Sequence, residues 1–188
     1  MNKLFRYAGI AASVALIAFG IGAVAVGANG HNRVGTELAR EQIVGTPDST
    51  IAGQKVDTGG EAQAFAKVMR KHTMEATGGK TYAQMPRYLD ASGKGTNDEK
   101  AAAVDPKSGA PVANPARNIW VTETALTTAL NTAYFAEGVA TFAIVMGIAM
   151  LLSGIGFLIL TLRVLREPAG EAEATKAATP RPQAAVTA

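Results

Sequence analysis

Four side chains between residues 69 and 85 have the donor atoms of a soft-metal site. Met69, Met74 and Met85 carry thioethers and His72 carries an imidazole, a ligand set that selects Cu(I). However, Met69 and His72 are three residues apart, so in a helix they share one face and would pack in a core. We favour packing and expect no bound metal or other cofactor.

A second candidate lies in residues 90–98 (DASGKGTND). Asp90, Ser92, Gly95 and Asp98 match the first, third, sixth and ninth positions of a calcium-binding EF-hand loop. The fifth position is Lys94, and the twelfth, where a bidentate Glu belongs, is Ala101. The sequence therefore predicts a solvated turn here, with calcium binding as the alternative.

Glu137 is a carboxylate at the edge of the second apolar segment. Ionisable groups inside a membrane usually serve an ion or proton pathway. Since Glu137 lies so near the boundary, we expect it to face water, and a place at the mouth of a conduit is the alternative.

The rest of the sequence offers no catalytic residue. The chain has no cysteine, which excludes disulfides, thiolate metal sites and cysteine nucleophiles. The net charge is +3, but the excess basic residues flank the apolar segments, and residues 29–136 hold 12 Lys and Arg against 11 Asp and Glu. No basic stripe or aromatic platform is present, so we expect no nucleic-acid partner.

Two apolar segments dominate the chain. Residues 8–28 carry no charge, and at 1.5 Å per residue they would span roughly 30 Å, the thickness of a bilayer core. Residues 138–162 are also uncharged and stop at Arg163 and Arg166. A helix this long and apolar on every face is typical of a membrane span. Lys3, Arg6 and residues 23–25 (AVA) also allow a cleaved secretory signal in place of the first span.

The basic flanks predict the topology. Lys3 and Arg6 precede the first apolar segment and Arg163 and Arg166 follow the second, so both termini are predicted to be cytoplasmic. We predict a plasma-membrane protein with five parts: a flank (1–7), a first transmembrane helix (8–28), an extracytoplasmic helical domain (29–136), a second transmembrane helix (137–162) and a disordered tail (163–188).

The external domain is predicted to be helical and rich in loops. Residues 33–44 are expected to continue the first span as a short helix. Residues 61–77 have apolar side chains at helical spacing and end at Gly78 and Gly79. We interpret residues 58–60 (TGG) as a stop, that is, a break in regular structure. Residues 81–89 are predicted to form a turn or two of helix, and residues 90–117 are predicted to be mostly loop.

The second span is predicted to be one helix with an external post, from about residue 115 to 165. Asn114 and Pro115 are typical of a helix start. Apolar residues recur on one face of the post: Ile119, Leu126, Leu130 and Ala133. We expect Phe65 and Met69 to pack on this face, because the domain has few other large apolar groups. The predicted fold is therefore an all-α membrane protein.

Small residues separated by four positions let helices approach closely. The candidate packing residues are Gly22 and Gly27 in the first span and Ala143, Gly147, Ala149 and Ser153 in the second. They predict that the spans pack together or against other membrane subunits.

Two stretches, HTMEATGGKTYAQMPRYLD and NDEKAAAVDPKSGAPVANPARNIWVTETALTTALNTAYFAE, resemble an uncharacterised family of small actinobacterial two-span membrane proteins. The likeness covers residues 35–160, and members are often labelled aromatic ring-opening dioxygenases. Such an iron site needs two convergent histidines and a carboxylate, and the chain has only His31 and His72. The resemblance implies an envelope protein with this architecture and adds no catalytic residue.

Three functions follow as hypotheses. The first is a non-enzymatic membrane protein that acts as a scaffold or accessory subunit of an envelope complex. The second is a homo-oligomeric conduit or transporter subunit, and the third is a metal-dependent dioxygenase that uses His72. The expected partners are the lipid bilayer and other membrane protein subunits or further copies of this chain.

Overall fold

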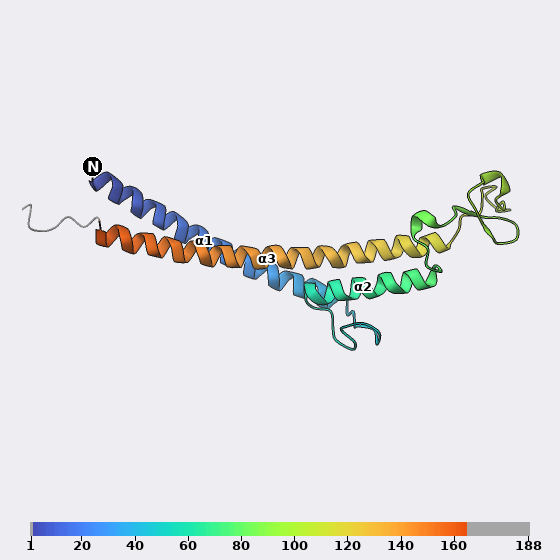
Figure 1. The fold of residues 1–188 in the computed structure, drawn as a ribbon, viewed down its shortest axis with the longest axis horizontal. Coiled ribbons are helices and arrows are strands. Elements are labelled where there is room, and N and C mark those ends of the chain that lie inside the picture. The colour runs from blue at the N-terminus through green and yellow to red at the C-terminus, as the bar shows by residue number, and fades with distance from the viewer. Residues whose placement is uncertain (1, 165–188) are drawn as a thin grey trace, which may run out of the picture. The chain divides into compact units, whose positions relative to one another are not determined.

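The computed structural model describes residues 2–164, and most of these residues are helical. The elements are α1 (Asn2–Arg40), α2 (Gly59–Ala76), η1 (Tyr82–Gln84), β1 (Tyr88–Leu89), β2 (Gly95–Thr96), η2 (Glu99–Ala101) and α3 (Ala116–Val164) (Figure 1). Both α1 and α3 are long and apolar enough to span a membrane. The predicted helical character, with two such helices, is confirmed. Most of the predicted disordered tail lies outside the described residues.

Helix α1 is longer than its apolar segment. It has 39 residues, or about 59 Å, and it includes most of the predicted flank 1–7. The predicted extension is present but ends at Arg40 rather than at residue 44. The chain leaves the helix there because Gln42 has a positive φ of 52°, which breaks the helical run.

Helix α3 confirms the predicted single helix over residues 115–165. The Asn114 side chain accepts a hydrogen bond from the backbone N–H of Ala116 at 3.1 Å and so satisfies one of the free donors at the helix start. The helix has 49 residues, or about 74 Å. The polar post and the apolar segment therefore need no break between them.

The described residues divide into two compact units, residues 2–23 with 146–164, and residues 24–145. In the first unit α1 and α3 are antiparallel and touch through small residues. A Cβ atom on Gly20 would lie 2.8 Å from the carbonyl oxygen of Gly147, and one on Gly154 would lie 3.0 Å from that of Ser13. The backbones are therefore so close at these points that no larger side chain fits between them.

These contact residues are spaced by seven positions rather than four. They are Ser13 and Gly20 on α1 and Gly147, Gly154 and Thr161 on α3, and all of them are buried. A seven-residue repeat of small residues keeps one seam of each helix facing the other. Of the predicted packing residues, the structure places Gly147 in this seam and leaves Gly22, Ala149 and Ser153 exposed, because residues four apart drift away from a seam of this period.

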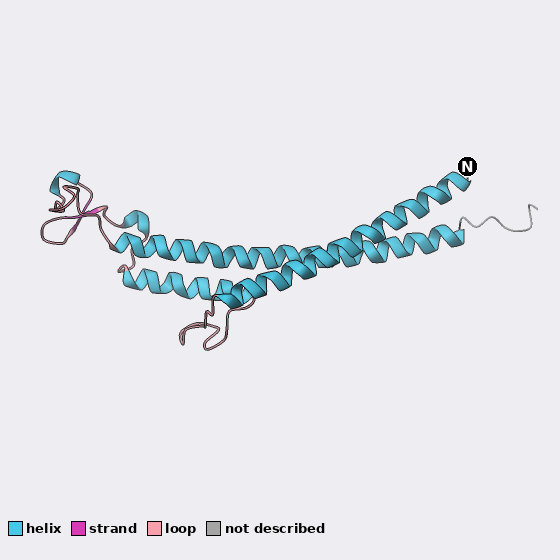
Figure 2. Cartoon of the chain, turned by 180° about the vertical axis from the view of Figure 1, so that it is seen from behind, coloured by secondary structure: helices cyan, strands magenta, loops and turns pink. Residues whose placement is uncertain are grey.

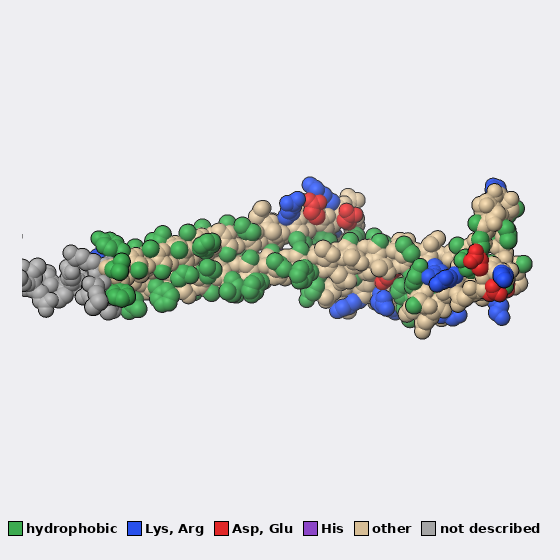
Figure 3. Space-filling model, turned by 90° about the horizontal axis from the view of Figure 1, so that it is seen from above, with side chains coloured by type: hydrophobic (Ala, Val, Ile, Leu, Met, Phe, Trp, Pro, Cys, Tyr) green, Lys and Arg blue, Asp and Glu red, His purple; other side chains and the backbone are tan. Residues whose placement is uncertain are grey.

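The outward faces of the first unit are apolar. Phe19 is 70% exposed and Phe157 is 55% exposed, and many other large apolar side chains lie open on both helices. Figure 3 shows them as hydrophobic surface along the two helices. A surface of this kind has a large cost in water and a small one in lipid.

The second unit packs α2 on α3 around a small core. The buried residues of this core are Leu38, Ile51, Val56, Ala62, Ala66 and Leu130. Phe65 and Met69 are half-buried against it. In the same unit Gly27 lies against the carbonyl oxygen of Ala140, and Ala143 is half-buried.

Helix α2 begins at residues 58–60, which the sequence analysis interpreted as a break in regular structure. Thr58 is the N-cap: its side chain accepts from the backbone N–H of Glu61, and the Glu61 carboxylate accepts from that of Thr58. This reciprocal capping box starts a helix, and Gly59 and Gly60 are its first residues. The helix ends as predicted at Gly78, which has a φ of 61°.

The face of α3 that packs on α2 differs from the predicted stripe. Trp120, Glu123 and Leu130 are 3–5% exposed, whereas Ile119 is 41% exposed and Leu126 is 47% exposed. This face is directed toward α2 because the Trp120 ring stacks under Arg70 of α2. The distance from the guanidinium carbon of Arg70 to the ring centroid is 5.1 Å. Only Leu130 of the predicted stripe is fully buried, and Ile119 and Leu126 lie open beside it.

Residues 80–115 form a small outer segment that is partly β rather than helical. β1 and β2 pair as an antiparallel hairpin, with Leu89 opposite Gly95 (Figure 2). The prediction of helix over residues 81–89 is therefore wrong after Gln84, and the fold is not purely α. This segment is tied to α3, because Trp120 donates its indole N–H to the Lys80 carbonyl at 2.9 Å and Arg117 donates to the Met85 carbonyl at 3.0 Å.

Candidate functional site

Glu137 joins three helices of the second unit. Its Oε2 atom accepts a hydrogen bond from the backbone N–H of Gly59, the first residue of α2, at 2.7 Å. Its Oε1 atom lies 3.5 Å from Nδ1 of His31 on α1. A carboxylate at a helix N-terminus compensates the free N–H groups and the helix dipole. Glu137 therefore fastens the start of α2 to α3. Its side chain is only 17% exposed, so the expectation that it faces water is wrong, because the start of α2 covers it.

A polar pocket of about 380 Å³ lies beside this junction. Its lining includes His31, Asn32, Thr36, Asp57 and Glu137. The side chain of His31 is 49% exposed, whereas that of Glu137 is 17% exposed. The structure thus brings together one histidine and one carboxylate that the sequence treated separately.

The second histidine pairs with a different carboxylate. Oδ2 of Asp48 lies 2.9 Å from both Nε2 of His72 and Nζ of Lys71. These hydrogen bonds, that from Lys71 foremost, hold the pKa of Asp48 well below its usual range. Asp48 therefore attaches the loop between α1 and α2 to the outer face of α2.

The two histidines contact different carboxylates. His31 lies beside Glu137 and His72 beside Asp48, and residues 2–164 contain no group of three or more His, Cys, Asp and Glu side chains placed to hold a metal ion. The two histidines are therefore not brought together with a carboxylate, as the alternative iron site would need. Met69 packs against the apolar core, as the packing interpretation expected, and Met85 is buried in the outer segment.

Asp90 is the first residue of the turn between β1 and β2. Its Oδ1 atom accepts from the Ser92 hydroxyl at 2.6 Å and from the backbone N–H groups of Ser92 and Lys94 at 2.9 Å. The hydroxyl bond is the main reason that the pKa of Asp90 is lowered. The carboxylate therefore stabilises the turn between β1 and β2, as the solvated-turn prediction expected.

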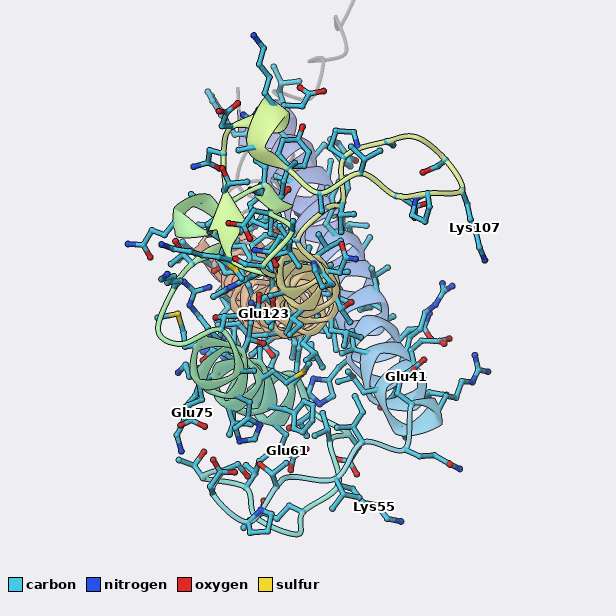
Figure 4. All side chains as sticks on the ribbon, turned by 90° about the vertical axis from the view of Figure 1, so that its right-hand side faces the viewer. Glu41, Lys55, Glu61, Glu75, Lys107 and Glu123 are labelled. Carbon is cyan, nitrogen blue, oxygen red and sulfur yellow. The ribbon has the colours of Figure 1, made fainter. Side chains whose placement is uncertain are left out.

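An apolar groove of about 860 Å³ lies in the second unit. Its floor carries side chains from all three helices: Val34, Leu38, Phe65, Met69, Leu126 and Leu130. Its charged lining residues are Arg33 and Glu37 on α1 and Glu41, which directly follows this helix. Figure 4, which looks along α3, labels Glu41 at the end of α1. The groove is where Leu126 of the predicted stripe lies.

A second pocket of about 420 Å³ lies further out between α2 and α3. Met69 and Thr73 contribute from α2, and Asn118, Ile119, Thr122 and Glu123 contribute from α3 with Pro115. The Glu123 side chain is 3% exposed. Sequence reasoning missed this residue, although it is the only charged residue between positions 118 and 136, and that isolation was an available signal.

The sequence matches no protein-family model, and comparisons with curated proteins and with solved structures also give no match.

Proposed function

We propose that this protein is a non-enzymatic integral membrane protein that holds a helix of a partner protein in its external groove, as a scaffold or accessory subunit of an envelope complex. In this proposal α1 and α3 cross the plasma membrane. The most apolar 18-residue windows of the two helices have mean hydropathies of 2.3 and 2.5, and only 11% of each window is buried. The core helix of a soluble protein would be mostly buried, so these exposed faces favour lipid as their surroundings.

The proposed orientation places both termini in the cytoplasm and residues 29–136 outside. Lys3 and Arg6 lie at one end of the first apolar segment, and Arg163 and Arg166 lie beyond the second. Basic residues in short flanks remain on the cytoplasmic side, whereas a loop longer than about 60 residues is exported largely regardless of its charge. The architecture agrees with that expected from the resemblance to actinobacterial two-span proteins, which stays a prediction.

The exposed groove is the observation that carries the functional proposal. On α3, a stripe that α2 does not cover continues through both pockets at alternating spacings of three and four: Ile119, Thr122, Leu126, Ala129, Ala133 and Ala136. This spacing is that of a seam between packed helices. Ile119 and Leu126 are 41% and 47% exposed, so the seam is open in the single chain.

Charge on the rim indicates how an occupying helix would be oriented about its axis. The charged rim residues Arg33, Glu37 and Glu41 lie on α1 or directly after its last residue, while α3 has no charged residue between positions 124 and 136. The complementary helix therefore presents charged side chains toward α1 and small or apolar ones toward α3. An amphipathic helix that enters an apolar groove is a common recognition mode.

Photocrosslinking in intact cells tests this proposal. A photoreactive residue at Leu126 lies in the groove. One at Val121, which is 56% exposed and points about 140° away from Leu126 around the axis of α3, provides a matched control. We expect a crosslink to one other membrane protein from position 126 and none from position 121. Crosslinks to a second copy alone would replace the accessory-subunit proposal with the homo-oligomeric one. Equal crosslinking from both positions would contradict a specific groove.

A further inference from the structure

We infer that the pocket around Glu123 binds a primary alkylammonium group, carried either by a small amine or by a lysine side chain of another protein. Glu123 lies on the side of α3 that faces α2, and Figure 4 labels it there. Its only hydrogen bond within the described residues comes from the hydroxyl of the adjacent Thr124, at 3.3 Å. This inference does not depend on the proposed partner helix.

A buried carboxylate normally has a strong partner, because an ionised group loses its hydration when it is enclosed. Within residues 2–164 Glu123 makes no ion pair, although Arg70 contacts Trp120 and Arg117 lies on the same helix. These two cations are engaged elsewhere: Arg70 stacks on Trp120, and Arg117 stacks on Tyr82 and donates to the Met85 carbonyl. The carboxylate is therefore available to a cation that comes from outside the chain.

The lining of the pocket selects the kind of cation. Thr73, Asn118 and Thr122 supply hydroxyl and amide oxygens next to the carboxylate, and Met69, Pro115 and Ile119 supply apolar surface. An ammonium group has three N–H donors and no acceptor, and its alkyl stem needs apolar contact. One carboxylate with neutral oxygens is a poor site for calcium, which usually takes several carboxylates among its six to eight oxygen ligands. The combination fits a primary alkylammonium ion.

Trp120 provides a direct readout, because it is the only tryptophan of the chain and lies one turn before Glu123 on α3. We would titrate the full chain in nanodiscs with n-butylammonium chloride at constant ionic strength and record tryptophan fluorescence. The comparison ligand is 1-butanol, which has the same alkyl stem without the charge. The variant is Glu123→Gln, and Glu75→Gln on the exposed face of α2 is the matched control.

We expect saturable binding of butylammonium, weakened at least tenfold in Glu123→Gln and unchanged in Glu75→Gln. Circular dichroism would verify that Glu123→Gln keeps its helices. Equal binding of 1-butanol, or an affinity of Glu123→Gln within twofold of the parent, would overturn the inference. Absence of saturable binding to the parent protein would do so as well. Carbodiimide coupling in native membranes then distinguishes the two sources. A small amine forms an amide that adds its own mass less one water to Glu123, the water being taken up by the carbodiimide as a urea, whereas a lysine joins a peptide of another protein to Glu123.

Discussion

Asp48 stabilises a loop that has few large side chains of its own. The loop between α1 and α2 buries Ile51 and Val56, and the hydrogen bonds from Lys71 and His72 to the Asp48 carboxylate connect it to α2. The three groups are 39–54% exposed, so solvent and salt screen the interaction. Its effect is therefore local, on the position of the loop, rather than on the stability of the whole unit.

Replacing Asp48 with Asn should loosen this loop and leave α2 intact. The loop's own hydrogen bonds, such as Gly45 N–H to the Gln54 carbonyl and Val56 N–H to the Ile43 carbonyl, should exchange their protons several-fold faster, because local opening becomes easier. Hydrogen–deuterium exchange measures this directly. Asp90→Asn is the control, since it should affect the hairpin of β1 and β2 and not this loop.

The stabilisation of the loop by the Asp48 carboxylate should also be lost in acid rather than near neutral pH. The pKa of Asp48 is lowered in the folded state, so its stabilisation is fully present above the unfolded value of about 3.9 and is lost as the pH falls through the folded value. Loop exchange, corrected for the intrinsic rate, should therefore show no Asp48-dependent change between pH 7 and pH 5. A difference between the parent protein and Asp48→Asn that disappears already at pH 5 would contradict this assignment.

Single residues were the hardest feature to predict from sequence. Glu137 was recognised as unusual, but its partner, the N–H of Gly59, is 78 positions away, and only the start of α2 at Gly59 brings it there. His31 and His72 could not be assigned partners for the same reason. Glu123 was missed because helical periodicity predicts the apolar stripe of a face and does not predict which charged neighbour becomes buried beside it.

At the scale of elements, the helices followed their sequence signals where those signals are local. Asn114 caps α3 and Gly78 ends α2, as expected from their types. The strand pair of Tyr88–Leu89 with Gly95–Thr96 could not be predicted in this way, because its stability depends on further bridges such as Tyr88 with Ala113. The face of α3 that α2 covers was likewise set by Trp120, whose hydrogen bond to the Lys80 carbonyl is non-local.

The contact of α1 with α3 gives a prediction at this scale. Gly20→Ala should destabilise the pairing by about 1–3 kcal/mol, because its Cβ would meet backbone atoms of Gly147 and Leu151 at 2.8–2.9 Å. Gly22→Ala is a matched control two residues away, with no atom of another residue within 4 Å of its Cβ, and it should be neutral or slightly stabilising.

Disulfide trapping can measure this effect, since the chain has no native cysteine. A Gly9→Cys and Thr161→Cys pair reports the contact, as a Cβ on Gly9 would lie 2.7 Å from Oγ1 of Thr161. Crosslinking yield should fall in the Gly20→Ala background and persist with Gly22→Ala. Equal yields in both backgrounds would mean that the seven-residue seam does not hold the helices together.

At the scale of the whole molecule, the proposal rests on how the chain crosses the membrane. Two long apolar helices with exposed surfaces agree with two spans, and the basic flanks are the basis of the proposed orientation. The hairpin and the lining residues of the groove and of the Glu123 pocket all fall within residues 29–136, so the proposed topology puts every proposed binding feature on the same side of the bilayer. The scaffold function and the ammonium site both require that side to be accessible to their ligands.

The most direct test of this account is labelling of single cysteines in intact cells with a membrane-impermeant maleimide. Lys107→Cys lies in the outer segment on an exposed loop (Figure 4), and Thr175→Cys lies beyond the second apolar segment. We predict that Lys107→Cys is labelled in intact cells and that Thr175→Cys is labelled only after the membrane is permeabilised. Labelling of Thr175→Cys in intact cells, with Lys107→Cys protected until permeabilisation, would contradict the proposed topology and the external groove with it.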